Sequence, residues 1–446
     1  MASLLFSLKA LTHGTAEYKD ALVRLANRGE TDSARVEPAV REILDAVKAE
    51  GDAAVLRYVA KFEQREPAAL FTRDIGGKAA LERLPKAARN ALELAADRIT
   101  EFHRKERDVM FGQGGFRFES EGRSLGLRVR PLARVGVYAP GGKARYPSSV
   151  LMSAIPAKVA GVAEIVLATP LANDAADDTL RAAAHLAGIE AVVDAGGAQA
   201  IAAMAWGTQT IPRVDKIVGP GNAYVACAKR MVYGAVAIDS IAGPSEILVV
   251  ADASANPAHV AADLLSQAEH DEDAYALLVT SDAALVSKVD AELERQLSDL
   301  PRATIARTSL ERHGQVFIVS SRNELAAVAN TIAPEHLSLQ VDDPDTMLDA
   351  IQHAGAAFVG GWTPEAVGDY VSGPNHVLPT ARSARFSSGL SVMDFLKRTT
   401  IARLTPAALA EIGPAAVRLA ASEGLSAHGL SVSARLAVLN EGRDEG

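Results

Sequence analysis

The chain has 446 residues, of which 48% are hydrophobic and 23% are charged, a composition typical of soluble globular domains. This length predicts two or three domains, at about 150 residues per domain, and leaves ample chain for a sizeable core. The net charge of −9 and the sequence pI near 5.7 argue against nucleic-acid binding.

A single cysteine, Cys227, excludes an intrachain disulfide and is compatible with a reducing compartment. Its thiol is either a core group or a nucleophile, and free cysteines are most often buried. Residues 1–14 contain a short apolar run that has no preceding basic residue, so we do not interpret it as a signal peptide. No uncharged apolar stretch approaches the ~20 residues of a membrane span, and we expect a cytoplasmic protein.

Helical periodicity dominates residues 35–105, where Leu92, Ala95, Ile99 and Phe102 recur at a spacing typical of a core-facing stripe. Residues 111–134 are instead Gly-rich with alternating side chains, a pattern that predicts hairpins and edge strands.

From residue 135 short apolar strands alternate with helices, first through RVGVY, AEIVLATP, AVVDAGG and DKIVGPGN. A second series begins at 245 and includes SEILVVAD, YALLVT, QVFIVS and HLSLQV. Two such series predict two Rossmann-like, doubly wound α/β domains with parallel sheets. After about residue 390 we expect no further strands, but two helices joined near Gly424.

Polar, Gly-rich turns interrupt the first series at residues 138–149, 194–200, 218–224 and 241–246. Ligands of open α/β sheets bind beyond the carboxyl ends of strands, and glycine allows close approach of the backbone. These turns either bind a nucleotide or only reverse the chain. The usual GxGxxG fingerprint does not follow any of the strands, so a dinucleotide would bind in an unusual way.

Metal-type ligands are scattered through the second half of the chain. Gln267 and His270, three residues apart, share one helix face, and Asp369, His376 and His428 stand in polar turns or helices. Zinc favours imidazole and carboxylate ligands, but no HExxH or CxxC spacing is present. Each histidine also has an interpretation that requires no metal. His270, for example, lies at the predicted end of a helix, where a protonated imidazole interacts favourably with the helix dipole.

Glu335 and His336 adjoin each other directly before an apolar strand. An adjacent acid and imidazole can serve as two proton-transfer groups near pH 7. The alternative is a loop glutamate beside a histidine at a strand edge.

Taken together and in order, these stretches resemble the histidinol dehydrogenase family from about residue 35 to the C-terminus. The resemblance is carried by VGVYAPGG, YPSSVLM, GGAQAIAA, VDKIVGPGNAYV, AGPSEILV, DLLSQAEH, PEHL, GDYVSGPNHVLPT, SSGLSV and EGLSAH. It implies a homodimer that oxidises L-histidinol through L-histidinal to L-histidine with two NAD+ and one water, the last step of histidine biosynthesis.

The resemblance also implies roles for residues. His336 would be the general base and Glu335 would activate water. One zinc per subunit would hold the substrate's imidazole and amine without redox chemistry. The implied zinc ligands are Gln267, His270, Asp369 and His428. Ser245, Glu335, Asp369, His376 and Glu423 match substrate-pocket positions, and Tyr138, Gln199 and Asn222 match NAD contacts.

The same resemblance suggests how the chain divides. We expect an N-terminal helical arm, a first α/β domain with the zinc and acid–base site, a second α/β domain for NAD, and a C-terminal helical segment. The C-terminal segment would be exchanged between subunits and would bring Glu423 and His428 to the partner's site. The expected ranges are 1–32, 33–137 with 245–390, 138–244 and 391–446, in that order.

Three other functions remain open from the residues. One is a related zinc and NAD dehydrogenase acting on another small alcohol, such as dihydroxypropanesulfonate. A zinc hydrolase without a cofactor is the second, because these ligands with a glutamate also suit metal-activated water. A binding protein without catalysis is the third, and it would leave the Glu335–His336 pair without an evident use.

Overall fold

The structure of the chain is a computed structural model that describes residues 7–28, 32–112, 114–141, 146–172 and 176–444. It divides into two compact units, residues 1–105 with 132–395 and residues 106–131 with 396–446. The first unit contains two six-stranded sheets with helices, and the second contains a three-stranded sheet with helices. The expected α/β class with two Rossmann-like sheets is confirmed.

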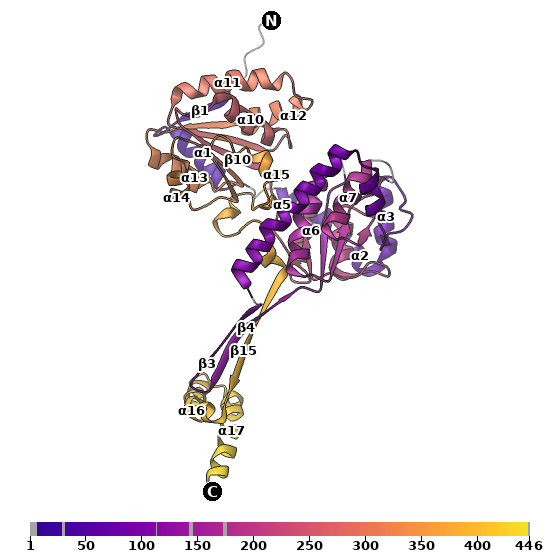
Figure 1. Cartoon of the computed structure of the whole chain (residues 1–446), viewed down its shortest axis with the longest axis vertical. Helices are drawn as coiled ribbons and strands as arrows, with labels where there is room; N and C mark the ends of the chain where they lie inside the picture. The colour runs from indigo at the N-terminus through magenta and orange to yellow at the C-terminus, as the bar shows by residue number, and fades with distance from the viewer. Residues whose placement is uncertain (1–6, 29–31, 113, 142–145, 173–175, 445–446) are drawn as a thin grey trace. The chain divides into compact units, whose positions relative to one another are not determined.

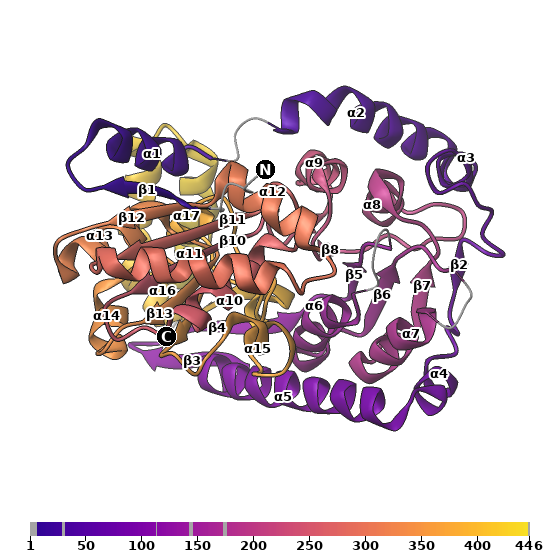
Figure 2. The same cartoon turned by 90° about the horizontal axis from the view of Figure 1, so that it is seen from above.

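The first of these sheets, the β10 sheet, has the strand order β1-β12-β11-β10-β13-β14, and all neighbours are parallel (Figures 1 and 2). Its strands are β1 (Lys9–Thr12), β10 (Glu246–Ala251), β11 (Tyr275–Thr280), β12 (Gln315–Ile318), β13 (His336–Gln340) and β14 (Ala356–Val359). One face is covered by α1 (Ala16–Ala26), α13 (Arg322–Ile332) and α14 (Pro344–Ala350). The other face is covered by α10 (Pro257–Ala268), α11 (Ala283–Leu297) and α12 (Ala303–His313).

The second sheet, the β5 sheet, has the order β2-β7-β6-β5-β8-β9 and is parallel except for β2, which runs antiparallel to β7. Its strands are β2 (Phe71–Thr72), β5 (Arg134–Tyr138), β6 (Glu164–Ala168), β7 (Ala191–Val193), β8 (Lys216–Val218) and β9 (Ala237–Ile238). The helices of this half are α2 (Asp32–Glu50), α3 (Asp52–Glu63), α4 (Gly77–Arg83), α6 (Pro147–Ala160), α7 (Ala176–Ala187), α8 (Gly197–Trp206) and α9 (Ala223–Val232).

Both sheets owe their form to strands that are apolar on both faces. All six residues of β10 are buried, as are all three of β7 and of β8, which requires helices on each side of the sheet. In each sheet the first long strand of its series lies in the middle, and the chain then winds outward first to one side and later to the other. Such a reversal beside the central strand creates a crevice where ligands bind.

The strands do not stop at residue 390, contrary to expectation. β15 (Leu396–Leu404) pairs antiparallel with β4 (Arg123–Pro131), which also forms a hairpin with β3 (Gly115–Ser120). The residues of β15 are exposed or half-buried throughout, so the strand lacks the apolar run on which the prediction depended. The two expected C-terminal helices are present as α16 (Pro406–Ser422) and α17 (Ser426–Asp444), separated by Gly424.

Several expected domain boundaries are wrong. Residues 134–137 and 106–131, expected in the zinc-site domain, belong to the β5 sheet and to the second compact unit, respectively. Residues 9–26 do not form a separate helical arm, because β1 pairs with β12 and α1 packs into the core of the β10 sheet. Helices α2 and α3, expected in the zinc-site domain, bury Val40, Ile43 and Val55 in the core of the β5 sheet instead. Sequence periodicity identifies these helices but carries no information on which sheet their apolar faces cover.

The long helix α5 (Lys86–Phe111) buries Leu92, Ala95 and Ile99, as its stripe predicts, whereas Phe102 is 42% exposed. The first unit also contains α15 (Glu365–Tyr370) and two short 3-10 turns, η1 (Ser383–Arg385) and η2 (Val392–Phe395). Cys227 is a buried residue of α9, as expected of a core thiol. None of the helices in the described part of the chain has the length and apolar character needed to cross a bilayer.

A buried ion pair fixes the turn that follows β8. Lys229 on α9 donates to the carbonyl of Gly219 (2.9 Å) and pairs with Asp239, whose other oxygen accepts the Gly219 N–H (2.7 Å). The two side chains are only 2% and 4% exposed, so each charge depends on the other for compensation.

We predict that Lys229→Met leaves Asp239 buried without its cation and destabilises the protein by about 3–5 kcal/mol. At about 2–4 °C per kcal/mol, the midpoint of thermal unfolding should fall by roughly 6–20 °C. In the double variant Lys229→Met/Asp239→Asn no buried charge remains, and calorimetry should show most of the midpoint restored. A single variant that unfolds within 2 °C of the original would contradict this assignment.

Candidate active site and metal centre

The Glu335–His336 pair lies at the amino end of a central strand. His336 is the first residue of β13, and parallel pairing places it opposite Ile247 on β10. The preceding residues, Glu246 on β10 and Glu335 before β13, therefore lie side by side. Glu246, Glu335 and His336 are 1%, 6% and 4% exposed, so their polar groups need partners within the protein.

The hydrogen bonding of His336 fixes its tautomer. Its Nδ1 lies 3.0 Å from the carbonyl oxygen of Glu246, an atom that can only accept, so Nδ1 carries the proton. The free lone pair is then on Nε2, which has no hydrogen-bond partner and lies 3.7 Å from Glu365 and 3.8 Å from Asp369. Burial lowers the pKa of His336, which keeps the ring neutral and the Nε2 lone pair free to accept a proton.

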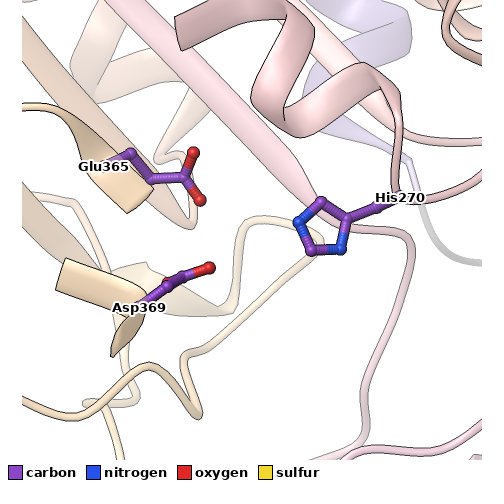
Figure 3. Close-up of side chains that lie close together, drawn as sticks. All are labelled: His270, Glu365 and Asp369. Atoms are coloured by element: carbon purple, nitrogen blue, oxygen red, sulfur yellow. The ribbon is translucent and has the colours of Figure 1, made fainter. Parts of the chain in front are cut away.

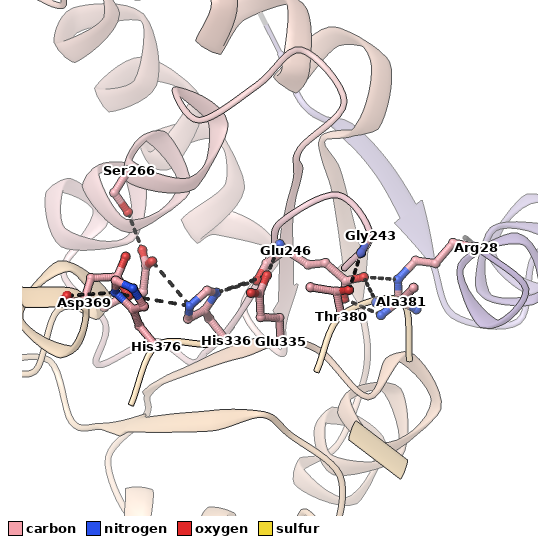
Figure 4. Close-up of polar contacts among 11 residues, drawn as sticks. Arg28, Gly243, Glu246, Ser266, Glu335, His336, Asp369, His376, Thr380 and Ala381 are labelled. Atoms are coloured by element: carbon pink, nitrogen blue, oxygen red, sulfur yellow. Dashed lines mark hydrogen bonds and ion pairs between the residues drawn. The ribbon is translucent and has the colours of Figure 1, made fainter. Parts of the chain in front are cut away.

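The carboxylate of Glu335 is also held by the backbone of Glu246. Its Oε2 accepts the backbone N–H of Glu246 at 2.9 Å, in the continuous series of polar contacts shown in Figure 4. Burial raises the pKa of Glu335 well above its usual value, and the charge of Glu246 adds to the rise. A carboxylate with a raised pKa is a stronger base once it is ionised.

Three metal-type ligands converge beside His336. The ligand atoms of His270, Glu365 and Asp369 all lie within 4.8 Å of one another, and Figure 3 shows the side chains directed toward a common space. His270 follows the end of α10, while Glu365 and Asp369 lie one turn apart on α15. Burial raises the pKa of each carboxyl group to about 7, and the charge of Glu365 adds to the rise at Asp369.

Gln267, in the last turn of α10, is a further candidate ligand. Its side chain is fully buried, and neither its Oε1 nor its Nε2 has a hydrogen-bond partner. Leaving both ends of a buried amide unpaired is costly, so the site is suited to a group that Gln267 can bind. A nitrogen ligand with carboxylate and amide oxygens fits a zinc ion, which the clustered carboxylates would also favour electrostatically.

The remaining expected residues divide into two sets. His376 is near the cluster, since its Nδ1 donates to the Asp369 carbonyl at 2.9 Å, and burial lowers its pKa to about 4. Ser245 immediately precedes Glu246 and is half-buried. Glu423 and His428 belong to the second compact unit, where both are exposed, so their participation stays a prediction.

The three expected NAD contacts line one cavity of about 870 Å³. They follow β5, β7 and β8 at the carboxyl ends of these strands, where three of the four Gly-rich turns also lie. Tyr138 accepts the Gly197 N–H with its hydroxyl (3.1 Å), Gln199 donates to Glu63 (3.3 Å), and Asn222 caps α9. Gly219 is required here, because its φ is +114° and an added Cβ would overlap the Tyr138 carbonyl. Residues 142–145 of the first turn lie outside the described residues.

The sequence analysis missed several residues of these sites. Glu365 precedes Asp369 by four residues, a spacing that would have placed both on one helix face. Tyr58 and Phe62 on α3 stack at 5.7 Å and line the cavity, where Phe62 is 52% exposed. Glu246 directly follows Ser245 in the quoted AGPSEILV stretch, but it was not singled out. Arg28, which forms a buried ion pair with Glu246, was also missed, because the sequence around it gives no sign of this contact.

Comparison with known proteins agrees with this geometry. A profile of the histidinol dehydrogenase family matches residues 26–436. A histidinol dehydrogenase from Cereibacter sphaeroides is 54% identical over 413 residues, which cover 92% of this chain and 94% of the relative. One from Syntrophotalea carbinolica is 49% identical and covers 96% and 99%, respectively. The crystal structure of histidinol dehydrogenase from Elizabethkingia anophelis superposes with a TM-score of 0.89 at 37% identity, covering 97% and 99% of the two chains.

We predict that His270→Ala and Asp369→Ala each weaken zinc binding by about 10- to 100-fold or more, because each removes a convergent ligand. Competition with a chromogenic chelator on the full chain measures the affinity. His353→Ala is the matched control, since this histidine lies outside the cluster and should leave zinc binding unchanged. Equal zinc affinities in the unaltered protein and the three variants would show that His270 and Asp369 do not bind the zinc ion.

Proposed function

The chain belongs to the histidinol dehydrogenase family, and we propose from this premise how its site performs the reaction of that family. It is an NAD-dependent oxidoreductase that converts L-histidinol to L-histidine, the last step of histidine biosynthesis. The observation that supports the mechanism best is the buried Glu335–His336 pair, whose free Nε2 faces the metal-type ligands.

His336 acts as the general base of both oxidations. Its Nε2 takes the proton from the substrate hydroxyl, because Nδ1 is already committed as a donor to the Glu246 carbonyl. The neutral ring that burial maintains is the form that can accept this proton. After this proton has been released to solvent, the same nitrogen takes a proton from the hydrated aldehyde in the second oxidation.

Glu335 acts between the two oxidations, when the aldehyde must gain water. Its carboxylate removes a proton from the water molecule that adds to the aldehyde carbon. Burial suits this role, since it makes the carboxylate a stronger base and limits the access of bulk water.

Gln267, His270 and Asp369 would hold the zinc ion in one subunit, with His428 of the partner subunit as the fourth ligand. Zinc supplies a Lewis acid and a template for the imidazole and amine of the substrate, without redox chemistry. Ser245, His376 and the partner subunit's Glu423 would line the substrate pocket. Glu365 lies within reach of the same centre and keeps its carboxylate oriented through a hydrogen bond from Ser266 (2.7 Å).

The cavity between Tyr138, Gln199 and Asn222 is the proposed site of NAD+, which accepts the hydride of each oxidation. A cavity of about 870 Å³ is of the size that cofactor pockets have. Tyr58 and Phe62 add aromatic faces on which a flat ring can stack.

The protein would work as a homodimer in the cytoplasm. Segment 391–446 is the proposed dimerisation element, and the second unit exposes large apolar side chains that a partner subunit could cover. They are Phe116, Phe118, Leu419, Leu430 and Val438, exposed by 50% to 67%. Exchange of this segment would bring His428 and Glu423 to the site of the other subunit.

Substrate identity is tested by NADH formation with L-histidinol and with dihydroxypropanesulfonate. We expect two NADH per L-histidinol and no comparable turnover of the sulfonate. Turnover of the sulfonate alone would establish the related dehydrogenase instead. Absence of any change in nicotinamide absorbance with both alcohols would refute an NAD-dependent reaction and leave a zinc hydrolase as the alternative.

His336→Asn should lower kcat by about 10²–10⁴-fold, because the amide cannot serve as the base. Zinc content should be unchanged, since His336 is not among the proposed ligands. Steady-state NADH formation and metal analysis measure the two quantities. The control is Cys227→Ala, a buried change on α9 that should keep kcat within a few-fold. Full turnover by His336→Asn would refute the assignment of the base.

A further inference from the structure

We propose that the buried ion pair between Arg28 and Glu246 positions the catalytic pair Glu335–His336, and that Arg28 is a positioning residue of this enzyme. The proposal depends on the acid–base roles given above. It assigns a function in catalysis to the segment after α1, which the sequence places more than two hundred residues away from the site.

The backbone of Glu246 forms hydrogen bonds with both of the proposed catalytic side chains. Its N–H donates to Oε2 of Glu335 at 2.9 Å, and its carbonyl oxygen accepts from Nδ1 of His336 at 3.0 Å. The position of this residue therefore sets both the orientation of the Glu335 carboxylate and the tautomer of His336.

The side chain of Glu246 is held in turn by Arg28. Oε1 accepts from Nε of Arg28 at 2.7 Å and from the backbone N–H of Ala381 at 2.7 Å, and Oε2 pairs with Nη2 of Arg28. The two side chains are only 3% and 1% exposed. A bidentate pair of this kind fixes both partners in one geometry. Figure 4 shows how it continues the series of contacts from Glu335.

Arg28 also contacts the chain that leads into the catalytic pair. Its Nη2 donates to the carbonyl of Ile332 at 2.8 Å, at the end of α13, and its Nη1 donates to the carbonyl of Leu25, in α1. Ile332 is three residues before Glu335. One guanidinium thus joins the start of β10, the approach to β13 and the end of α1.

Loss of the guanidinium would leave the Glu246 carboxylate buried and uncompensated, close to a second buried carboxyl group, that of Glu335. Displacement of Glu246 would then alter both hydrogen bonds to the catalytic pair, and a shift of about 1 Å can reduce a rate by about 100-fold. The proposed zinc ligands Gln267, His270 and Asp369 lie in α10, just after α10 and in α15, whereas the hydrogen bonds of Arg28 go to Leu25, Glu246 and Ile332. Binding of zinc and substrate should therefore change much less than turnover.

The test compares Arg28→Met, Arg28→Lys and the double variant Arg28→Met/Glu246→Gln in the full-length, zinc-loaded protein. For Arg28→Met we expect kcat to fall by about 100-fold, while the histidinol KM and the zinc content stay within about threefold. Arg28→Lys restores the charge without the bidentate geometry, so its kcat should be intermediate. The double variant should regain thermal stability, because the uncompensated charge of Glu246 is removed, but its kcat should stay low.

Two further measurements separate positioning from general stability. Turnover of added L-histidinal should fall in parallel with turnover of L-histidinol, because Glu246 holds both catalytic groups. Arg307→Met is the control. It breaks a pair with Glu294 (3.0 Å) on helices α11 and α12 of the same sheet and should leave kcat unchanged.

The proposal is overturned if Arg28→Met keeps kcat within threefold, or if kcat recovers together with stability in the double variant. It is also overturned if only one of the two oxidations slows. Absence of histidinol turnover in the unaltered protein would instead refute the proposed function, so the two failures are distinguishable.

Discussion

Strands β10 and β13 are parallel neighbours in which His336 pairs with Ile247, and the proposed catalytic geometry depends on this register. Parallel pairing places Glu246 next to the Glu335–His336 step, so that one peptide group on each side of Glu246 is directed at a catalytic side chain. A shift of the register by one residue would turn His336 to the other face of the sheet.

Burial has two opposite consequences at this site. It suits the proposed roles, since it keeps His336 neutral and makes the Glu335 carboxylate a stronger base once it is ionised. It also makes the site expensive to fold, because Glu246, Glu335 and Glu365 are all nearly inaccessible to water. The structure compensates each of them differently, with Arg28 for Glu246, a backbone N–H for Glu335 and the hydroxyl of Ser266 for Glu365. A zinc ion would add the remaining positive charge at Glu365 and Asp369.

The resemblance to a family, and not spacing alone, indicated which residues to expect at the site. Local patterns show only that His270 and Gln267 share a helix end and that Tyr138, Gln199 and Asn222 lie at the ends of strands or in the turns after them. The structure brings the last three to one cavity. Arg28 could not be found in this way, because its partner Glu246 is 218 residues distant and the ion pair forms only when β1 and α1 join the sheet. The assignment of α2 and α3 to the wrong sheet has the same origin, since an apolar helix face does not specify which sheet it covers.

The two sheets have the same strand order but use opposite ends for chemistry. In the β5 sheet the turns proposed to bind NAD follow the carboxyl ends of the strands, which agrees with the general rule for ligand sites of open α/β sheets. In the β10 sheet Glu246 and His336 are instead the first residues of their strands. Helix α10 runs back toward the amino ends of these strands, with Gln267 in its last turn and His270 directly after it. Strand-end backbone groups at this edge are unpaired by the ladder and so remain available to orient side chains. The acid–base pair can therefore be held by main-chain groups of Glu246, a more rigid support than a second layer of flexible side chains would give.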